Sequence, residues 1–207
     1  MARLPFIAAL QAAVGPTELG MVGPDTPARP EGTVIWAHCA HPDQVPALKT
    51  LGRRLIEDGE MITIIATLPE PDQNGHQASP NTKHSTRAFL GHWQPQIVLW
   101  QGGQISAVPL LEIKRTKIPV IFVETDSDGF EPSTSPRFSG KLRATLGVFA
   151  AILAIDDASA QRLVKLGADP AKTRVLGPLE DGVSPPPYNE PERAKLVTSF
   201  AARPMWL

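Results

Sequence analysis

Short apolar runs alternate along the chain with segments of helical periodicity. Residues 34–36 follow one another without polar alternation, which is typical of a strand buried on both faces. Residues 44–59 then repeat their apolar side chains at helical spacing and end at a glycine. The same alternation continues through the middle of the chain. It predicts six strands, near residues 33–38, 61–67, 96–100, 118–124, 151–155 and 173–176.

Strands that alternate with helices predict βαβ units, in which the strands lie parallel in one sheet. Right-handed crossovers between such strands place helices on both faces. The sequence therefore predicts an α/β fold with a doubly wound, mainly parallel, Rossmann-like sheet. The helix near residues 82–93 is expected to have its cap at Asn81 or Thr82. Residues 69–81 show no periodicity and are expected to form a long loop.

The apolar and proline patterns divide the chain into three parts. Residues 1–28 contain a short apolar segment, expected as a helix that docks on a partner domain or lies against a membrane surface. The weak positive charge before it and the lack of a clear cleavage site speak against a signal peptide. Residues 29–181 contain the predicted sheet. Residues 182–207 combine a proline-rich linker with one helix and the opening of a strand, which we expect to begin a C-terminal domain.

Composition excludes several classes of protein. The formal net charge of the 207 residues is -1, so nothing global favours nucleic-acid binding. Cys39 is the only cysteine, which excludes an intrachain disulfide and a cysteine zinc site and fits a reducing cytoplasm. No apolar run approaches the ~18 residues that a membrane span requires.

The run VIWAHCAHPDQ, residues 34–44, carries candidate chemistry at the end of the first predicted strand. Pro42 ends the strand, so the turn lies at the carboxyl edge of the sheet, where open α/β sheets bind ligands. Adjacent His38 and Cys39 are expected to point to opposite faces, which disfavours a shared zinc ion. A cysteine in a buried strand is usually inert. We therefore expect neither a metal, another cofactor, nor a thiol nucleophile here.

Two further segments are expected at the same edge. Gly102 and Gly103 lie between a strand and a helix, where their amides could approach an anion or could form only a tight turn. Lys83 and Arg87, near the start of a helix, could contact a phosphorylated acceptor or could belong to a solvated helix face. The sequence leaves both pairs of alternatives open.

Three stretches of the chain carry a family resemblance. They read RPEGTVIWAHCA at 29–40, PLLEIKRTKIPVIFVETD at 109–126 and ILAIDDASAQRLVKLGADPAKTRVLGPLED at 152–181. These stretches resemble the Kdo transferase family, whose members move 3-deoxy-D-manno-octulosonate from its CMP-activated form to the lipid A precursor. The resemblance extends over residues 29–207 and implies the N-terminal half of a GT-B glycosyltransferase.

The resemblance implies a role in lipopolysaccharide synthesis. The partners that it implies are a lipid A precursor, bound by this half, and the donor CMP-Kdo, bound mainly by a C-terminal half. It implies no cofactor and a cytoplasmic location at the inner membrane, with peripheral membrane contact. An isolated domain whose neighbouring half is absent is also expected to expose its interdomain face and could form a homodimer.

The charged site residues of the family are largely replaced in this chain. After the first strand the family reads His-x-x-Ser-x-Gly-Glu, and its glutamate is the proposed general base. Here His38 matches the histidine, His41 stands at the serine and Gln44 stands at the glutamate. A glutamine amide cannot accept a full proton at neutral pH. Asp43, which stands at the glycine, is the neighbour expected to substitute for the base.

Two other motifs of the family are also changed. A Glu-x-Glu-Leu-Trp-Pro run is replaced by residues 101–106, in which Gly102, Gly103 and Gln104 are expected to contact substrate. A family lysine falls on Glu180, which is likewise expected in the substrate site. Two classes of function follow: a Kdo-transferase-like glycosyltransferase, or a non-catalytic relative that binds a sugar, a lipid-linked ligand or a protein partner.

Overall fold

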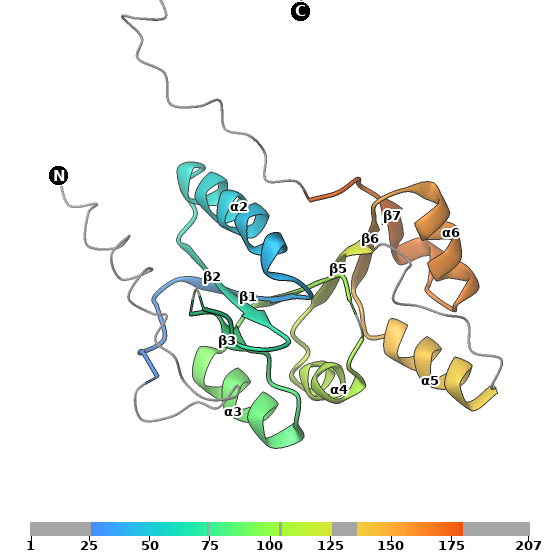
Figure 1. Ribbon diagram of the computed structural model, residues 1–207, viewed down its shortest axis with the longest axis horizontal. Coiled ribbons are helices and arrows are strands. Elements are labelled where there is room, and N and C mark those ends of the chain that lie inside the picture. The colour runs from blue at the N-terminus through green and yellow to red at the C-terminus, as the bar shows by residue number, and fades with distance from the viewer. Residues whose placement is uncertain (1–25, 74, 104, 126–135, 180–207) are drawn as a thin grey trace, which may run out of the picture.

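The computed structural model describes residues 26–73, 75–103, 105–125 and 136–179. Over these residues the chain forms one parallel sheet in the strand order β3-β2-β1-β4-β5-β6-β7 (Figure 1). Every strand pairing in it is parallel, which confirms the predicted α/β, Rossmann-like fold. The strands are β1 Thr33–Cys39, β2 Ile62–Leu68, β3 Gln77–Ala78, β4 Ile97–Gln101, β5 Val120–Thr125, β6 Ala151–Ala154 and β7 Thr173–Val175.

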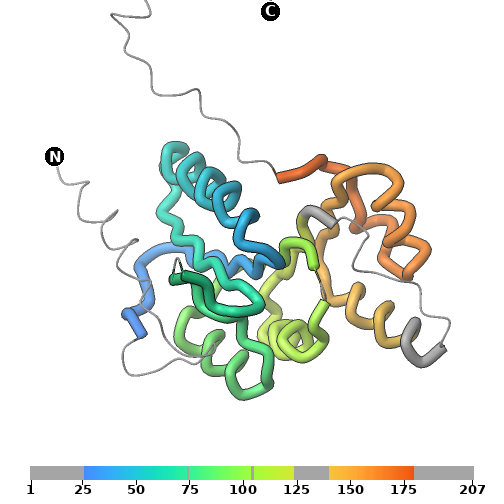
Figure 2. The backbone as a smooth tube through the Cα atoms, viewed as in Figure 1, coloured from blue at the N-terminus to red at the C-terminus, as the bar shows by residue number. Residues whose placement is uncertain are grey.

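Helices cover both faces of the sheet. Figures 1 and 2 show α2 on one face and α3 and α4 on the other, as a doubly wound topology requires. The helices are α2 Val45–Glu57, α3 Lys83–Trp93, α4 Ala107–Thr116, α5 Pro136–Leu146 and α6 Asp157–Lys165, with short 3₁₀ turns η1 Pro42–Gln44 and η3 Pro170–Lys172.

Polar side chains fix where two of the helices begin. The Thr82 hydroxyl accepts a hydrogen bond from the Ser85 amide at 3.1 Å, which confirms one of the two caps predicted for α3. The Asp156 carboxylate accepts from the Ser159 amide at 2.7 Å and caps α6. This hydrogen bond holds the pKa of Asp156 below its ordinary value.

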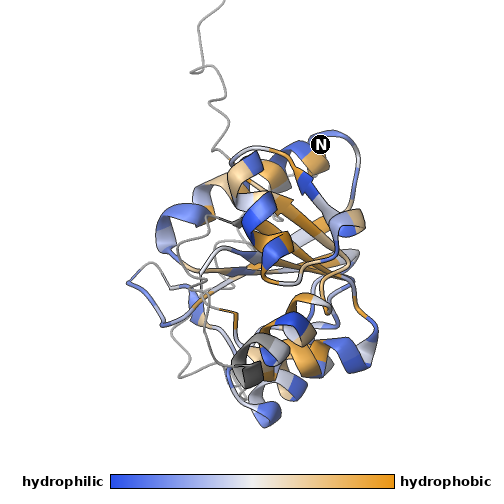
Figure 3. Ribbon diagram, turned by 90° about the vertical axis from the view of Figure 1, so that its right-hand side faces the viewer, coloured by the Kyte–Doolittle hydropathy of each residue, from blue (hydrophilic) through white to orange (hydrophobic). Residues whose placement is uncertain are grey.

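The core consists of two clusters, one on each face of the sheet. The cluster under α3 and α4 is rich in aromatic rings and contains Trp36, Phe89 and Phe122. The cluster under α2 is aliphatic and contains Ile35 and Leu48. Neighbouring residues of β1 thus contribute to opposite clusters, as the period of two of a strand requires. Figure 3 shows the hydrophobic residues gathered along the strands and the inward sides of the helices.

One prediction about the strands is wrong. Residues 69–81 were expected to form a loop, but Gln77 and Ala78 form the edge strand β3, so the described sheet has seven strands rather than six. These residues pair with Thr67 and Leu68, and the Ser79 amide donates to the Leu68 carbonyl at 2.6 Å. A strand of two residues is too short to show any periodicity in the sequence.

The two outer parts predicted for the chain stay predictions. The helix expected near the N-terminus and the segment 182–207 lie outside the described residues. Residues just before β1 are attached to the end of α3, because Arg29 Nε donates to the Trp93 carbonyl at 3.0 Å. Among the helices that the structure describes, none has both the length and the apolar character needed to cross a membrane.

Two adjacent leucines of α4 test how the helix packs on the sheet. Leu110 is fully buried, whereas Leu111 is 49 % exposed. We expect Leu110→Ala to lower the free energy of unfolding by about 2–5 kcal/mol, because it removes buried methyl groups and leaves a cavity. Leu111→Ala should change it by less than about 1 kcal/mol. Urea denaturation measures both, and equal losses would contradict this packing.

Candidate functional site

The strand order creates a topological switch point between β1 and β4. From β1 the chain winds outward through β2 and β3, then returns to place β4 on the other side of β1. Ligands of open α/β sheets bind outside the carboxyl ends of the strands at such a point. The turn after β1, residues 40–44, and the turn after β4, residues 102–103, meet there. We call these two turns the switch-point edge.

The two turns are in direct contact. The Ala40 amide donates to the Gln101 carbonyl at 3.1 Å, which continues the pairing of β1 with β4 past the end of the strand. A Cβ atom added to Gly103 would lie 2.5 Å from the Ala40 Cβ. The structure therefore brings together the two turns that the sequence singled out separately.

Gln44 shapes the turn after β1. Its Oε1 accepts hydrogen bonds from the Ala40 amide at 2.8 Å and from the His41 amide at 3.1 Å. One side-chain oxygen thus satisfies two backbone donors between the end of β1 and the start of α2. His41 and Asp43 are exposed beside it, and no described residue fixes the Asp43 carboxylate.

His38 belongs to a buried hydrogen-bond network that the sequence did not predict. The imidazole Nδ1 lies 2.5 Å from the Ser79 hydroxyl, which donates to the Thr67 hydroxyl at 2.8 Å. The Trp36 indole N–H donates to the same Thr67 oxygen at 2.8 Å. Thr67 in turn donates to the Ala37 carbonyl at 3.4 Å. The network ties β1, β2 and the residue after β3 together at the carboxyl edge of the sheet.

This network favours one position for the imidazole proton. The Thr67 oxygen accepts from the Trp36 indole and directs its single proton to the Ala37 carbonyl, so it accepts from Ser79 as well. Ser79 has then used its own proton and must accept one from His38 Nδ1. The neutral imidazole therefore presents Nε2 as an acceptor.

His38 and Cys39 lie on opposite faces of β1, as expected. The His38 ring packs on the Trp100 ring with centroids 4.1 Å apart, on the aromatic side of the sheet. Cys39 is fully buried in the aliphatic cluster. Trp93 and Trp100 are both buried in the aromatic cluster. In the described ranges, no three His, Cys, Asp or Glu side chains gather where they could hold a metal ion.

Gly102 and Gly103 form a tight turn. Their φ values are 61° and 68°, in the left-handed region that favours glycine. The Gly102 amide donates to the Val123 carbonyl at 3.1 Å, so it is already engaged within the sheet. These observations favour the turn over the anion site. Gln104 and Glu180, the other two residues expected to contact substrate, lie outside the described residues.

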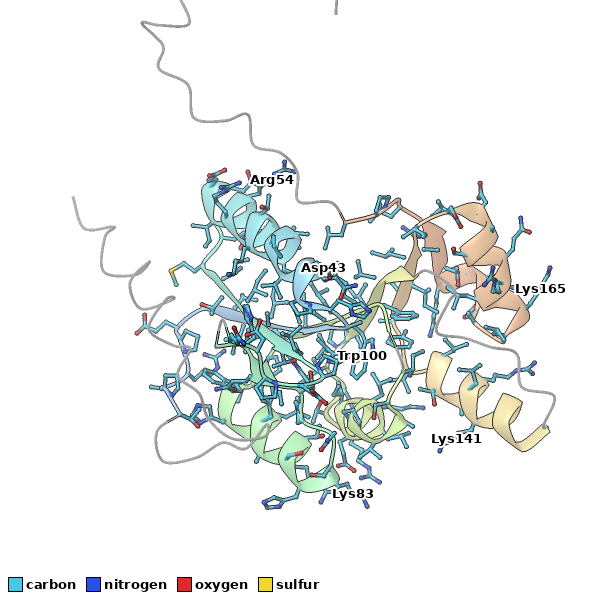
Figure 4. The ribbon with its side chains drawn as sticks, in the orientation of Figure 1. Asp43, Arg54, Lys83, Trp100, Lys141 and Lys165 are labelled. Carbon is cyan, nitrogen blue, oxygen red and sulfur yellow. The ribbon has the colours of Figure 1, made fainter. Side chains whose placement is uncertain are left out.

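The two cations of α3 differ in their surroundings. Arg87 Nε donates to Glu112 Oε2 at 2.7 Å, and Arg115 bonds the other carboxylate oxygen. Only 4 % of the Glu112 side chain is exposed, and the hydrogen bond from Arg87 is the main cause that lowers the pKa of its carboxyl group. Arg87 therefore links α3 to α4. Lys83 is exposed, and Figure 4 shows it at the start of α3, on the other side of Trp100 from Asp43.

The parallel strands, their order and the switch point together define an α/β, Rossmann-like domain of the kind that forms half of a GT-B fold. Within that class, the chain belongs to the family described as 3-deoxy-D-manno-octulosonic-acid transferase (kdotransferase), whose N-terminal domain matches residues 16–180. This match confirms the resemblance read from the sequence. A sequence search of curated proteins finds no significant match.

Solved structures of similar fold include a complex with UDP and a putative epimerase. The S. aureus MnaA–UDP co-structure has 13% identity and a TM-score of 0.50, over 82% of this chain and 51% of that one. A putative UDP-N-acetylglucosamine 2-epimerase from Listeria monocytogenes has 14% identity and a TM-score of 0.51, over 80% of this chain and 51% of that one. The chain thus spans about half the length of these structures, and the likeness concerns the fold alone.

Two glycine substitutions test the contact between the turns. We expect Gly103→Ala to lower the free energy of unfolding by about 2 kcal/mol or more, because the residue has a positive φ and its new Cβ would collide with Ala40. Gly91→Ala, at an exposed helical position with no neighbouring atom within 4 Å, should instead raise it by up to about 1 kcal/mol. Chemical denaturation distinguishes the two, and a neutral Gly103→Ala would contradict the close approach.

Proposed function

We propose that this chain is the acceptor-binding half of a glycosyltransferase that moves 3-deoxy-D-manno-octulosonate from CMP-Kdo to a lipid A precursor in lipopolysaccharide synthesis. Membership of the kdotransferase family supports the reaction class. The observation that carries the proposal is the contact between the turns after β1 and β4 at the switch point of the sheet, where this fold class binds ligands.

The donor, in this proposal, is bound mainly by a C-terminal half. The acceptor sugar approaches the turn after β1, where His38, His41 and Gln44 lie, with Lys83 available to a phosphate group of the acceptor. Because the acceptor is lipid-linked, the protein would work at the cytoplasmic face of the inner membrane through peripheral contact. The homodimer of the isolated domain stays a prediction.

The rate of transfer depends on how the acceptor hydroxyl loses its proton. General-base assistance is worth about 10² to 10⁴ in rate, or roughly 3 to 5 kcal/mol of activation free energy. The amide at Gln44 cannot supply this assistance, and its oxygen is engaged by two backbone amides. The same observation supports a second candidate, a relative that binds a sugar, a lipid-linked ligand or a protein partner without turnover.

Separate titrations test the division of labour between the halves. We expect this chain to bind a glucosamine disaccharide bisphosphate, a soluble analogue of the acceptor, and to show no micromolar affinity for CMP. Isothermal titration calorimetry measures both. Micromolar CMP binding without acceptor binding would contradict the assignment as the acceptor half.

A single substitution tests the proposed defect in catalysis. In the protein carrying both GT-B halves, we expect Gln44→Glu to raise Kdo transfer to the lipid A precursor, because a carboxylate can hold the same two amides and also accept a proton. Transfer of radiolabelled Kdo measures the rate. Gln44→Ala is the control that removes the turn contacts without adding a base. Transfer that Gln44→Glu fails to raise would contradict the proposed defect at residue 44.

A further inference from the structure

His38 combines burial, a fixed tautomer and one nitrogen with no assigned partner. Its Nδ1 proton is donated to Ser79, and 7% of the residue remains exposed. No described residue forms a hydrogen bond with Nε2. The Nε2 atom of the imidazole thus offers an oriented lone pair near the end of β1, just before the turn of residues 40–44.

A second group without a partner lies next to it. Trp100 faces His38 across the β1–β4 pairing, and its buried indole N–H has no hydrogen-bond partner among the described residues. Unpaired buried donors are uncommon and call for an explanation such as a bound ligand or water. The indole of Trp93 is also unpaired, so this feature alone is weak. What distinguishes Trp100 is that its ring contacts the His38 imidazole, 4.1 Å between centroids, at the carboxyl edge.

We propose that His38 accepts the proton of the acceptor hydroxyl through Nε2 and so takes the role for which Gln44 is unsuited. The inference rests on the function proposed above. The hydroxyl O–H bond breaks and its proton moves to the Nε2 lone pair. The oxygen electron pair forms the bond to the anomeric carbon of the donor sugar, whose bond to the CMP phosphate oxygen breaks with its electrons on CMP.

The basicity of His38 is adequate for this step. Burial lowers its pKa to about 4, so the imidazole is neutral at neutral pH and Nε2 is free of a proton. The conjugate acid is then about as acidic as a glutamic acid, whose ordinary pKa is about 4.3. A neutral imidazole in this site therefore has a basicity similar to that of the carboxylate proposed as the family's base, which would stand at residue 44.

Ser79 is a positioning residue in this scheme. It accepts the Nδ1 proton and keeps Nε2 unprotonated, while Thr67 and Trp36 fix the direction of the Ser79 hydroxyl. When the imidazole becomes charged, the same hydrogen bond to Ser79 remains, because Nδ1 is a donor in both states. By comparison, no described residue orients the Asp43 carboxylate, and Asp43 lies on the exposed side of the turn.

Nuclear magnetic resonance of the chain tests the site without requiring activity. With ¹⁵N-labelled histidine, we expect His38 to be the Nδ1–H tautomer at neutral pH. Adding the glucosamine disaccharide bisphosphate should shift its Nε2 resonance. Ser79→Ala should keep the fold and mix the two tautomers. An Nε2–H tautomer in the unchanged chain, or binding of the analogue with no shift at Nε2, would overturn the inference.

Transfer kinetics of the protein carrying both GT-B halves test the proton step. We expect His38→Gln to lower kcat by about 10² to 10⁴, with KM changed only a few-fold, because glutamine fills similar space and hydrogen-bonds but takes no proton. The matched control is His92→Gln, at the last turn of α3 near the opposite edge of the sheet, where His92 Nε2 bonds the Pro27 carbonyl. It should retain the rate of the unchanged protein.

The outcomes separate this inference from the proposed function. If the unchanged protein shows no transfer, the proposed function fails, and the resonance experiment alone decides whether Nε2 meets the acceptor sugar. If the unchanged protein transfers Kdo and His38→Gln retains the rate, the inference is overturned. It is also overturned if Asp43→Ala abolishes transfer and His38→Gln does not. If thermal melting shows that His38→Gln is unfolded, Ser79→Ala is used in its place. We expect Ser79→Ala to lower kcat, because its His38 no longer holds a single tautomer.

Discussion

The pairing of β1 with a neighbour on each side is the constraint on which the rest of the structure depends. Parallel hydrogen bonds to β2 and β4 fix the register of β1 along its length. Since side chains alternate between faces, this register places His38 in one row with Thr67 and Trp100, and it buries Cys39 on the other face. A slip of one residue would exchange the faces and bury the imidazole under α2 instead. The hydrogen-bond network and the ring contact therefore both follow from the sheet.

The turn after β1 explains how a family scaffold persists when its charged residues change. A side-chain oxygen at position 44 can hold the turn by accepting hydrogen bonds from the Ala40 and His41 amides, and Gln44 does so. Unlike a carboxylate, however, the amide of glutamine cannot take up a proton. The shape of the turn and its proton chemistry are therefore separable at this one residue. His38 is held by Ser79 rather than by Gln44, so its orientation does not depend on this change.

The sequence predicted the fold well, because buried parallel strands and amphipathic helices leave strong local patterns. It also predicted that the turns after β1 and β4 lie at one edge of the sheet, since that edge follows from strand direction. It did not predict β3, which is too short to have a period, or Ser79, which looks like any loop serine. The bond between His38 and Ser79 spans 41 residues and exists only once β3 has paired with β2. The sequence left the Gly102–Gly103 turn undecided, because the partner of its amide lies on β5.

The central claim is that a phosphorylated sugar acceptor binds at the switch-point edge. Hydrogen–deuterium exchange of the chain, with and without glucosamine disaccharide bisphosphate, tests this claim most directly. The account predicts slower exchange in the turns after β1 and β4 and at the start of α3, with little change around His92 and the strand beginnings. Protection confined to that opposite edge, or to β7 and α6, would contradict it.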